Sequence, residues 1–198
     1  MSIWDRYKKK KSPTASPTSV EIKKKVTRTY KGNDYTIFTG MSNYIWILDA
    51  GHGGIINGTY QTEGKRSPVW EDGSQLFEGV SNRGFVMNIA KQLESMGITY
   101  VILCHTEHDT PLAIRTELAN KIASEVDKKC IYVSIHSDAW KTPDAIGWSV
   151  FTSPGQTSSD IVAQEFALTF KRVFPNERLR FDNSDGDLDK EAKFWVLR

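Results

Sequence analysis

Apolar and polar positions along residues 44–198 follow two alternating patterns, which predict strands followed by helices. Short apolar runs bounded by turn residues predict strands at 44–49, 99–104, 130–135, 147–152 and 193–197. Apolar residues spaced at i, i+3, i+4 and i+7 predict helices over 80–96 and 111–126. Ser158 or Ser159 is expected to cap a third helix, which carries an apolar stripe at Val162, Phe166, Phe170 and Val173 and is ended by Pro175. This order predicts an α/β fold: a single domain with a mostly parallel central sheet flanked by helices.

The first 42 residues differ from the rest in composition. Residues 1–20 join a run of four lysines to a Ser/Pro/Thr stretch, which predicts a flexible basic arm. This arm is either a solvated tail or a segment attracted to an anionic polymer. Residues 21–42 are expected to form a β-hairpin or a linker, with strands at 26–30 and 35–38 around the turn-rich residues 31–34. The main domain is then expected to span 43–198.

Composition excludes several classes of protein. The chain of 198 residues is 39% hydrophobic and has six Trp and nine Phe, so a sizeable core is feasible. Its formal net charge is +2, so nucleic acid is not the expected partner. Two cysteines, Cys104 and Cys130, do not make a disulfide scaffold, and both are expected to be reduced. No secretory signal is visible, and no apolar run is expected to be long enough for a membrane span.

Two histidines follow apolar strands, and an acidic residue opens the helix between them. His52 comes just after strand 44–49, His136 just after strand 130–135, and Glu78 at the start of the first helix. Active sites in open α/β sheets gather at the carboxyl ends of the strands, so these side chains are expected to converge. Two imidazoles and one carboxylate suit zinc and leave a fourth position for water. Glycines next to His52 are expected to let the backbone turn sharply there, at positions 51, 53 and 54.

Polar residues near these three are candidates to orient the imidazoles, namely Asp49, Ser134, Ser137 and Asp138. The long loop 53–77 joins two of the proposed ligands and is expected to wall the site. Each residue also has a plain structural interpretation, because a histidine after a strand is usually a surface residue and a glutamate at a helix start usually serves the helix dipole. His105 and His108 lie in a polar turn and are expected to be surface residues.

Six segments, in an order that covers residues 44–198, resemble the zinc-dependent N-acetylmuramoyl-L-alanine amidases of the type 3 amidase family. In chain order they are Leu48-Asp49-Ala50-Gly51-His52-Gly53-Gly54, Glu78 with Asn82-Arg83, Leu112-Ala113-Ile114-Arg115 with Ala119-Asn120, Ser134-Ile135-His136-Ser137-Asp138-Ala139, Ala145-Ile146-Gly147-Trp148-Ser149-Val150-Phe151, and Phe194-Trp195-Val196-Leu197-Arg198. The loop 64–68 and the N-terminus look most like phage or prophage lysins of this family.

The resemblance implies Zn²⁺ held by His52, Glu78 and His136, and cleavage of the amide that joins N-acetylmuramic acid to L-alanine in peptidoglycan. It implies second-sphere or substrate-groove roles for Asp49, Ser134, Asp138 and Arg115. It also implies that the protein stays in the host cytoplasm until release and then acts on the cell wall, or is carried by the virion.

One departure from the family pattern concerns the general acid/base. The family has a further helix and strand after the Val-Leu-Arg segment, and that strand carries a second glutamate. Nothing in 1–198 matches it, so this glutamate is expected beyond Arg198, and a partner is expected to cover the edge left open. Glu191 lies upstream of the last predicted strand, which is the wrong edge for this role.

Two alternatives therefore stay open at this stage. The chain could be a non-catalytic peptidoglycan-binding or virion structural module that keeps the zinc site. It could also be a zinc peptidase that acts on stem peptides.

Overall fold

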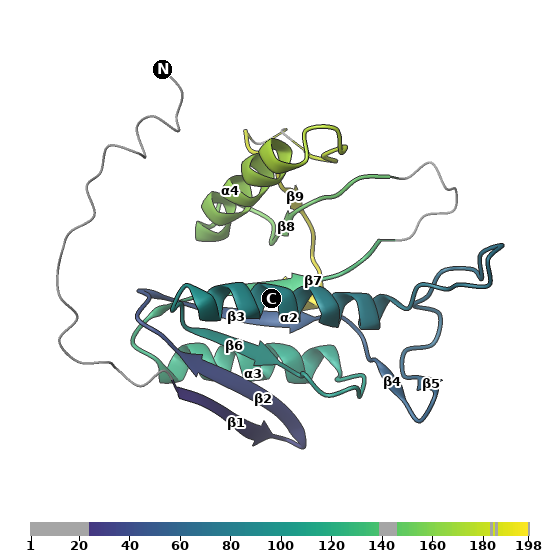
Figure 1. The fold of residues 1–198 in the computed structure, drawn as a ribbon. Coiled ribbons are helices and arrows are strands. Elements are labelled where there is room, and N and C mark those ends of the chain that lie inside the picture. Colours follow the sequence, from purple (N-terminus) through teal and green to yellow (C-terminus); the bar gives the residue numbers. More distant parts are fainter. Residues whose placement is uncertain (1–23, 139–145, 183, 185, 198) are drawn as a thin grey trace.

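A five-stranded mixed sheet forms the centre of the computed structural model, which describes residues 24–138, 146–182, 184 and 186–197 (Figure 1). The expected arm 1–20 lies outside the described residues. The strand order is β1-β2-β6-β3-β7, with bounds Lys24–Tyr30, Asn33–Thr39, Tyr100–Leu103, Tyr44–Ala50 and Lys129–Ile135. Strands β6, β3 and β7 are parallel, as predicted, whereas β1 and β2 run antiparallel to their neighbours. The prediction of a single α/β domain is confirmed.

Helices cover both faces of this sheet, and the period-two alternation of the strands decides which residue meets which helix. Helix α2 (Glu78–Ser95) lies on one face and α3 (Leu112–Glu125) on the other (Figure 1). In β3, Ile45 and Ile47 pack in the same buried cluster as Leu118 and Ile122 of α3. The alternate residues Leu48 and Ala50 pack with Val86, Ala90 and Leu93 of α2. Both faces are thus buried, which explains the near-continuous apolar strands.

The predicted hairpin is part of the central sheet. Strands β1 and β2 are joined by Lys31 and Gly32, whose φ values are 46° and 77°. A two-residue turn with two positive φ values matches the right-handed twist of its strands. The connection is therefore shorter than the predicted 31–34, because Asn33 already pairs with Tyr30. The antiparallel pairing of β2 with β6 extends the sheet by two strands.

The predicted strand 147–152 is confirmed only in part, and the predicted strand 193–197 was wrong. In 147–152, only Phe151–Thr152 forms a strand (β8), and it pairs with β9 (Lys190–Glu191) in a separate two-stranded sheet. Residues 195–197 form a 3₁₀ turn, η1 (Trp195–Leu197), in place of a strand. Both apolar runs are short, and periodicity alone does not separate a buried strand from another apolar segment. In the first run, Trp148 makes only an isolated parallel bridge with Leu179, through hydrogen bonds with the backbone of Arg178 and Arg180.

Helix α4 (Ser158–Val173) lies with β8 and β9 beyond the β7 edge of the sheet (Figure 1). Its N-cap is Thr157, which forms a capping box with Asp160. The predicted caps, Ser158 and Ser159, are instead the first two residues of the helix. Its buried residues are Ala163 and Ala167. The predicted stripe is only partly buried, since Phe170 and Val173 are 40% and 58% exposed.

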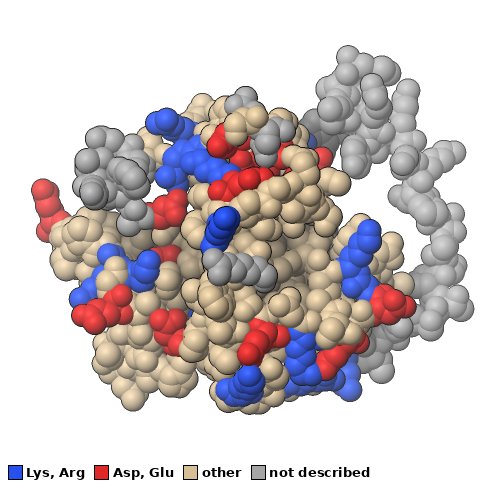
Figure 2. Space-filling model, turned by 180° about the vertical axis from the view of Figure 1, so that it is seen from behind, with Lys and Arg blue, Asp and Glu red and all other residues tan. Residues whose placement is uncertain are grey.

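The surface carries both signs of charge side by side. On the face seen in Figure 2, lysines and arginines are interspersed with aspartates and glutamates. This distribution agrees with the small net charge of +2 and offers no single-sign track for a nucleic acid on that face. Within the described ranges, no helix is long and apolar enough to cross a bilayer.

Candidate metal centre

His52, Glu78 and His136 converge at the carboxyl ends of β3 and β7. His52 follows β3, His136 follows β7, and Glu78 is the first residue of α2. Glu78 Oε1 lies 3.2 Å from His52 Nε2 and 3.3 Å from His136 Nδ1. One donor atom from each residue lies within 4.8 Å of the other two, and within the described part of the chain no other group of three such residues does so.

The donor atoms have the spacing that a small divalent cation requires. Ligands about 2.1 Å from a tetrahedral zinc lie roughly 3.4 Å from one another, which is close to the two observed separations. The two imidazole rings are nearly perpendicular, at 89°, with centroids 4.9 Å apart. The His136 side chain is 35% exposed, so the cluster is open to solvent on that side. An open three-ligand set is typical of catalytic zinc sites.

The charge of Glu78 also suits a cation. Burial acts to raise the pKa of its carboxyl, but hydrogen bonds from His136, from His52 and from the Ser137 N–H act in the opposite direction and outweigh burial. The net pKa lies well below its ordinary value. Glu78 is therefore an anionic carboxylate between two imidazoles at neutral pH.

His52 itself adopts a left-handed backbone, with a φ of 68°. This conformation is uncommon for a residue with a side chain and needs support from its surroundings. The His52 carbonyl accepts hydrogen bonds from two guanidinium groups, Arg83 Nη1 at 2.8 Å and Arg115 Nη2 at 3.3 Å. Arg83 also donates to the carbonyls of Gly79 and Thr106, and so links the His52 turn to α2 and to the segment after β6. Arg83 is part of the family segment Asn82-Arg83, but the sequence did not predict this role for it.

A buried polar network lies behind this turn. Asp49 is fully buried and accepts hydrogen bonds from Arg115 Nη1, from the Tyr132 hydroxyl and from the Ser134 hydroxyl. These hydrogen bonds join Asp49 and Ser134 to each other and to Arg115 and Tyr132, and their predicted part in orienting the imidazoles stays a prediction. Their influence on His52 passes through Arg115. Tyr132 is a member that sequence reasoning missed, since a tyrosine in an apolar strand gives no signal of its polar partner.

The other predicted residues lie around the cluster. The Ser137 N–H donates to Glu78 Oε1 at 3.0 Å, so its backbone orients the carboxylate in place of its side chain. Asp138 pairs with Arg180 at 2.6 Å and ties the end of β7 to the C-terminal segment. His108 is exposed, and His105 lies 3.4 Å from the Thr36 hydroxyl, outside the cluster of three.

The glycines beside His52 serve close packing. A Cβ added to Gly51 would lie 2.2 Å from Cε1 of His136, and one added to Gly79 would lie 1.9 Å from the Gly53 carbonyl oxygen. The sharp turn was expected at the glycines, but the positive φ belongs to His52. The absence of side chains at these glycines leaves room for the His136 imidazole and for the start of α2 against the turn.

Loop 53–77 is anchored to the first turn of α2. It contains a small hairpin, β4 (Ile55–Ile56) and β5 (Thr59–Tyr60). The Tyr60 hydroxyl accepts from the Gly79 N–H and donates to the Lys65 carbonyl, which also accepts from the Glu78 N–H. The loop thus fixes the backbone of a proposed ligand, and its role as a wall of the site stays a prediction.

This chain matches a known protein family in sequence and two solved structures in fold. Residues 47–198 match the Amidase_3 family, N-acetylmuramoyl-L-alanine amidase. The fold is similar to that of N-acetylmuramoyl-L-alanine amidase AmiC2 of Nostoc punctiforme, with a TM-score of 0.57 and 22% identity over 80% of this chain and 74% of that one. It is also similar to the CwlD amidase from Clostridioides difficile, solved in complex with the GerS lipoprotein, with a TM-score of 0.56 and 20% identity over 78% of this chain and 75% of that one. No curated protein sequence matches the chain. The match over residues 47–198 places this chain in the N-acetylmuramoyl-L-alanine amidase family.

Proposed function

We propose that this amidase depends on a zinc ion held by His52, Glu78 and His136, and that it cleaves the amide between N-acetylmuramic acid and L-alanine in peptidoglycan. The observation that carries the proposal is the convergence of two imidazoles and one ionised carboxylate at an open edge of the sheet. When bound, zinc polarises a scissile carbonyl and lowers the pKa of a coordinated water.

The protein residues position this chemistry. Glu78 supplies negative charge that offsets the charge of the cation. Arg83 and Arg115 hold the strained His52 turn, and the Ser137 N–H fixes the Glu78 carboxylate. Substrate would approach on the side where His136 is exposed.

Metal content and product chemistry test the proposal together. The purified protein should contain about one zinc per chain, and His52→Ala and His136→Ala should each lose it. His108→Ala is the matched control, because it removes an exposed histidine outside the cluster and should keep its zinc.

Incubation with purified peptidoglycan should release new L-alanine amino termini, and a chelator should abolish that release. New termini within the stem peptide would instead support a zinc peptidase. Normal zinc content with wall binding but no cleavage would support the non-catalytic module.

We also propose that the protein acts as a phage or prophage lysin, released from the host cytoplasm onto the cell wall or carried by the virion. The lysin-like loop 64–68 supports this role. Expression inside bacteria should cause lysis only after the inner membrane is permeabilised. Lysis of intact cells without permeabilisation would contradict the need for a separate release step.

A further inference from the structure

The peptide group between His52 and Gly53 is held by polar contacts at both of its ends. Its carbonyl, which belongs to His52, accepts hydrogen bonds from Arg83 and Arg115. At the other end, the Gly53 N–H donates to the Thr62 hydroxyl at 2.7 Å. This N–H directly follows a proposed zinc ligand whose φ is 68°, so its hydrogen bond helps to fix the backbone orientation at that ligand.

The Thr62 hydroxyl is oriented in turn by Asp109. A hydroxyl has a single proton, and Thr62 donates it to Asp109 Oδ2 at 2.7 Å, which leaves a lone pair for the Gly53 N–H. The other oxygen of this carboxylate, Oδ1, lies 3.7 Å from Arg115 Nη2. The same Nη2 donates to the His52 carbonyl at 3.3 Å. The contacts therefore form a closed ring, which runs from the carbonyl of one peptide group through Arg115, Asp109 and Thr62 back to the N–H of that group.

Three separate segments meet in this ring. Thr62 follows β5 of the small hairpin in loop 53–77, Asp109 lies between β6 and α3, and Arg115 belongs to α3. The hairpin lies beyond the carboxyl ends of β3 and β6 (Figure 1). A Cβ added to Gly53 would lie 2.6 Å from the Cβ of Gln61 and 2.9 Å from the Asp109 nitrogen. The small space at this glycine thus lets both segments approach the turn closely enough for the hydrogen bonds to form.

We propose that Thr62 and Asp109 are positioning residues for the zinc ligand His52, a role that rests on the zinc centre proposed above. The orientation of the peptide group after His52 and the path of β3 before it together determine where the His52 side chain points. In the structure its Nε2 lies 3.2 Å from Glu78 Oε1. Residues that orient a metal ligand without touching the metal commonly change metal affinity about 10–100-fold when they are replaced.

A purely structural role for the ring predicts a different result. The Asp109 side chain is 36% exposed, and its hydrogen bond with Thr62 lies at the surface. If the ring served only to attach loop 53–77 to the segment before α3, its loss would lower the stability of the protein and leave the folded zinc centre unchanged. Zinc affinity separates the two roles. The visible spectrum of bound Co²⁺ also separates them, because it reports the geometry of the same ligands.

Zinc affinity of the whole chain, measured by competition with a chelator, tests the proposal. Thr62→Val keeps the shape of the side chain and removes the hydroxyl, so the zinc dissociation constant should rise about tenfold and the Co²⁺ spectrum should change. Thr62→Ser keeps the hydroxyl and should match the parent in both measurements. Thr59→Val is the matched control, because it removes an exposed hydroxyl from β5 of the same hairpin, outside the ring.

Asp109→Asn tests the ring at an exposed position, where the replacement is compatible with folding. Its amide oxygen can still accept from Thr62, but the negative charge that faces Arg115 is lost. Zinc binding should therefore weaken less than in Thr62→Val. The double variant should lose less affinity than the sum of the two single losses, since both residues act through one ring.

Amide exchange in the metal-free protein separates this proposal from the proposed zinc dependence. The Gly53 N–H should exchange faster in Thr62→Val than in the parent or in Thr62→Ser. The proposal is overturned if folded Thr62→Val matches the parent in zinc affinity and Co²⁺ spectrum, or if Thr62→Ser binds zinc as weakly as Thr62→Val. A parent without zinc would contradict the zinc dependence itself, and the exchange of Gly53 would then decide alone whether Thr62 holds this turn.

Discussion

Replacement of Arg115 by methionine should strongly destabilise the fold and loosen the metal centre. The Arg115 side chain is 1% exposed and its partner Asp49 is completely buried. Burial acts to lower the pKa of Arg115, but the charge of Asp49, the nearby Cys104 and the hydrogen bond to Asp49 together outweigh burial and raise the pKa, so Arg115 stays a cation. Arg115→Met keeps most of the side-chain volume but leaves the Asp49 carboxylate without its counter-charge and the Ala50 carbonyl without its donor.

The expected loss follows from this burial. Removal of one partner of a buried ion pair costs about 3–5 kcal/mol, because the other charge stays buried and uncompensated. In a chain of this size, 1 kcal/mol corresponds to roughly 2–4 °C, so the unfolding midpoint should fall by roughly 6–20 °C. Lys31→Met is the matched control. Its partner is Glu117, but the two side chains are 52% and 47% exposed, so solvent screens the pair and the unfolding midpoint should stay close to that of the parent.

Urea unfolding of the metal-free protein measures the free energy, and a double-mutant cycle with Asp49→Asn isolates the coupling. The double variant should lose less stability than the sum of the two single variants, because it removes the stranded charge. The zinc affinity of Arg115→Met should also fall, because Arg115 holds the His52 carbonyl. A loss under about 1 kcal/mol for Arg115→Met, or strict additivity in the cycle, would refute the idea that an ionic pair supports this turn.

Three further predictions concern local packing, capping and metal. Gly51→Ala should displace the His136 imidazole and lower the zinc content of the folded protein, as measured by metal analysis. Gly84→Ala is the control, because its added Cβ would meet nothing within 4 Å; it should keep its zinc and gain about 0.5–1 kcal/mol of stability in urea unfolding. Thr157→Ala removes the capping box of α4 and should cost about 0.5–2 kcal/mol, and an unchanged unfolding midpoint would show that the cap is dispensable. Chelation of a zinc-loaded sample should lower its unfolding temperature and zinc should restore it, whereas an equal temperature in both states would argue against a resident ion.

Local patterning specified the central part of this fold. The alternation of Ile45, Ile47 and Leu48 assigns each side chain to one face of the sheet, since successive residues of a strand point to opposite sides. Parallel strands then bring their carboxyl ends to one edge, and His52 and His136 must lie there. These conclusions need only short-range periodicity and one topological rule, so they could be predicted from the chain alone.

The partners of individual residues depended on long-range packing. Asp49 binds Arg115, which is 66 residues away in the sequence. The left-handed turn at His52 is maintained by two arginines from different helices, a condition that no local motif encodes.

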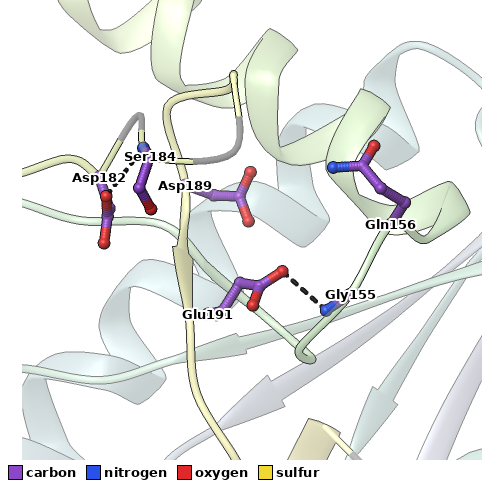
Figure 3. A pocket seen from close by; sticks show the side chains of 6 residues that line it. All are labelled: Gly155, Gln156, Asp182, Ser184, Asp189 and Glu191. Carbon is purple, nitrogen blue, oxygen red and sulfur yellow. Dashed lines mark hydrogen bonds between the residues drawn. The ribbon is translucent and has the colours of Figure 1, made fainter.

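The C-terminal third was the least predictable part for the same reason. The apolar run at 147–152 is compatible with a central strand, yet it pairs with residues near 179 and 190. The free energy of each alternative pairing is a sum over contacts from distant segments, so a local pattern cannot rank them. The cavity lined by Asp182, Asp189 and Glu191 (Figure 3) lies beside that pairing, so only the folded chain reveals it.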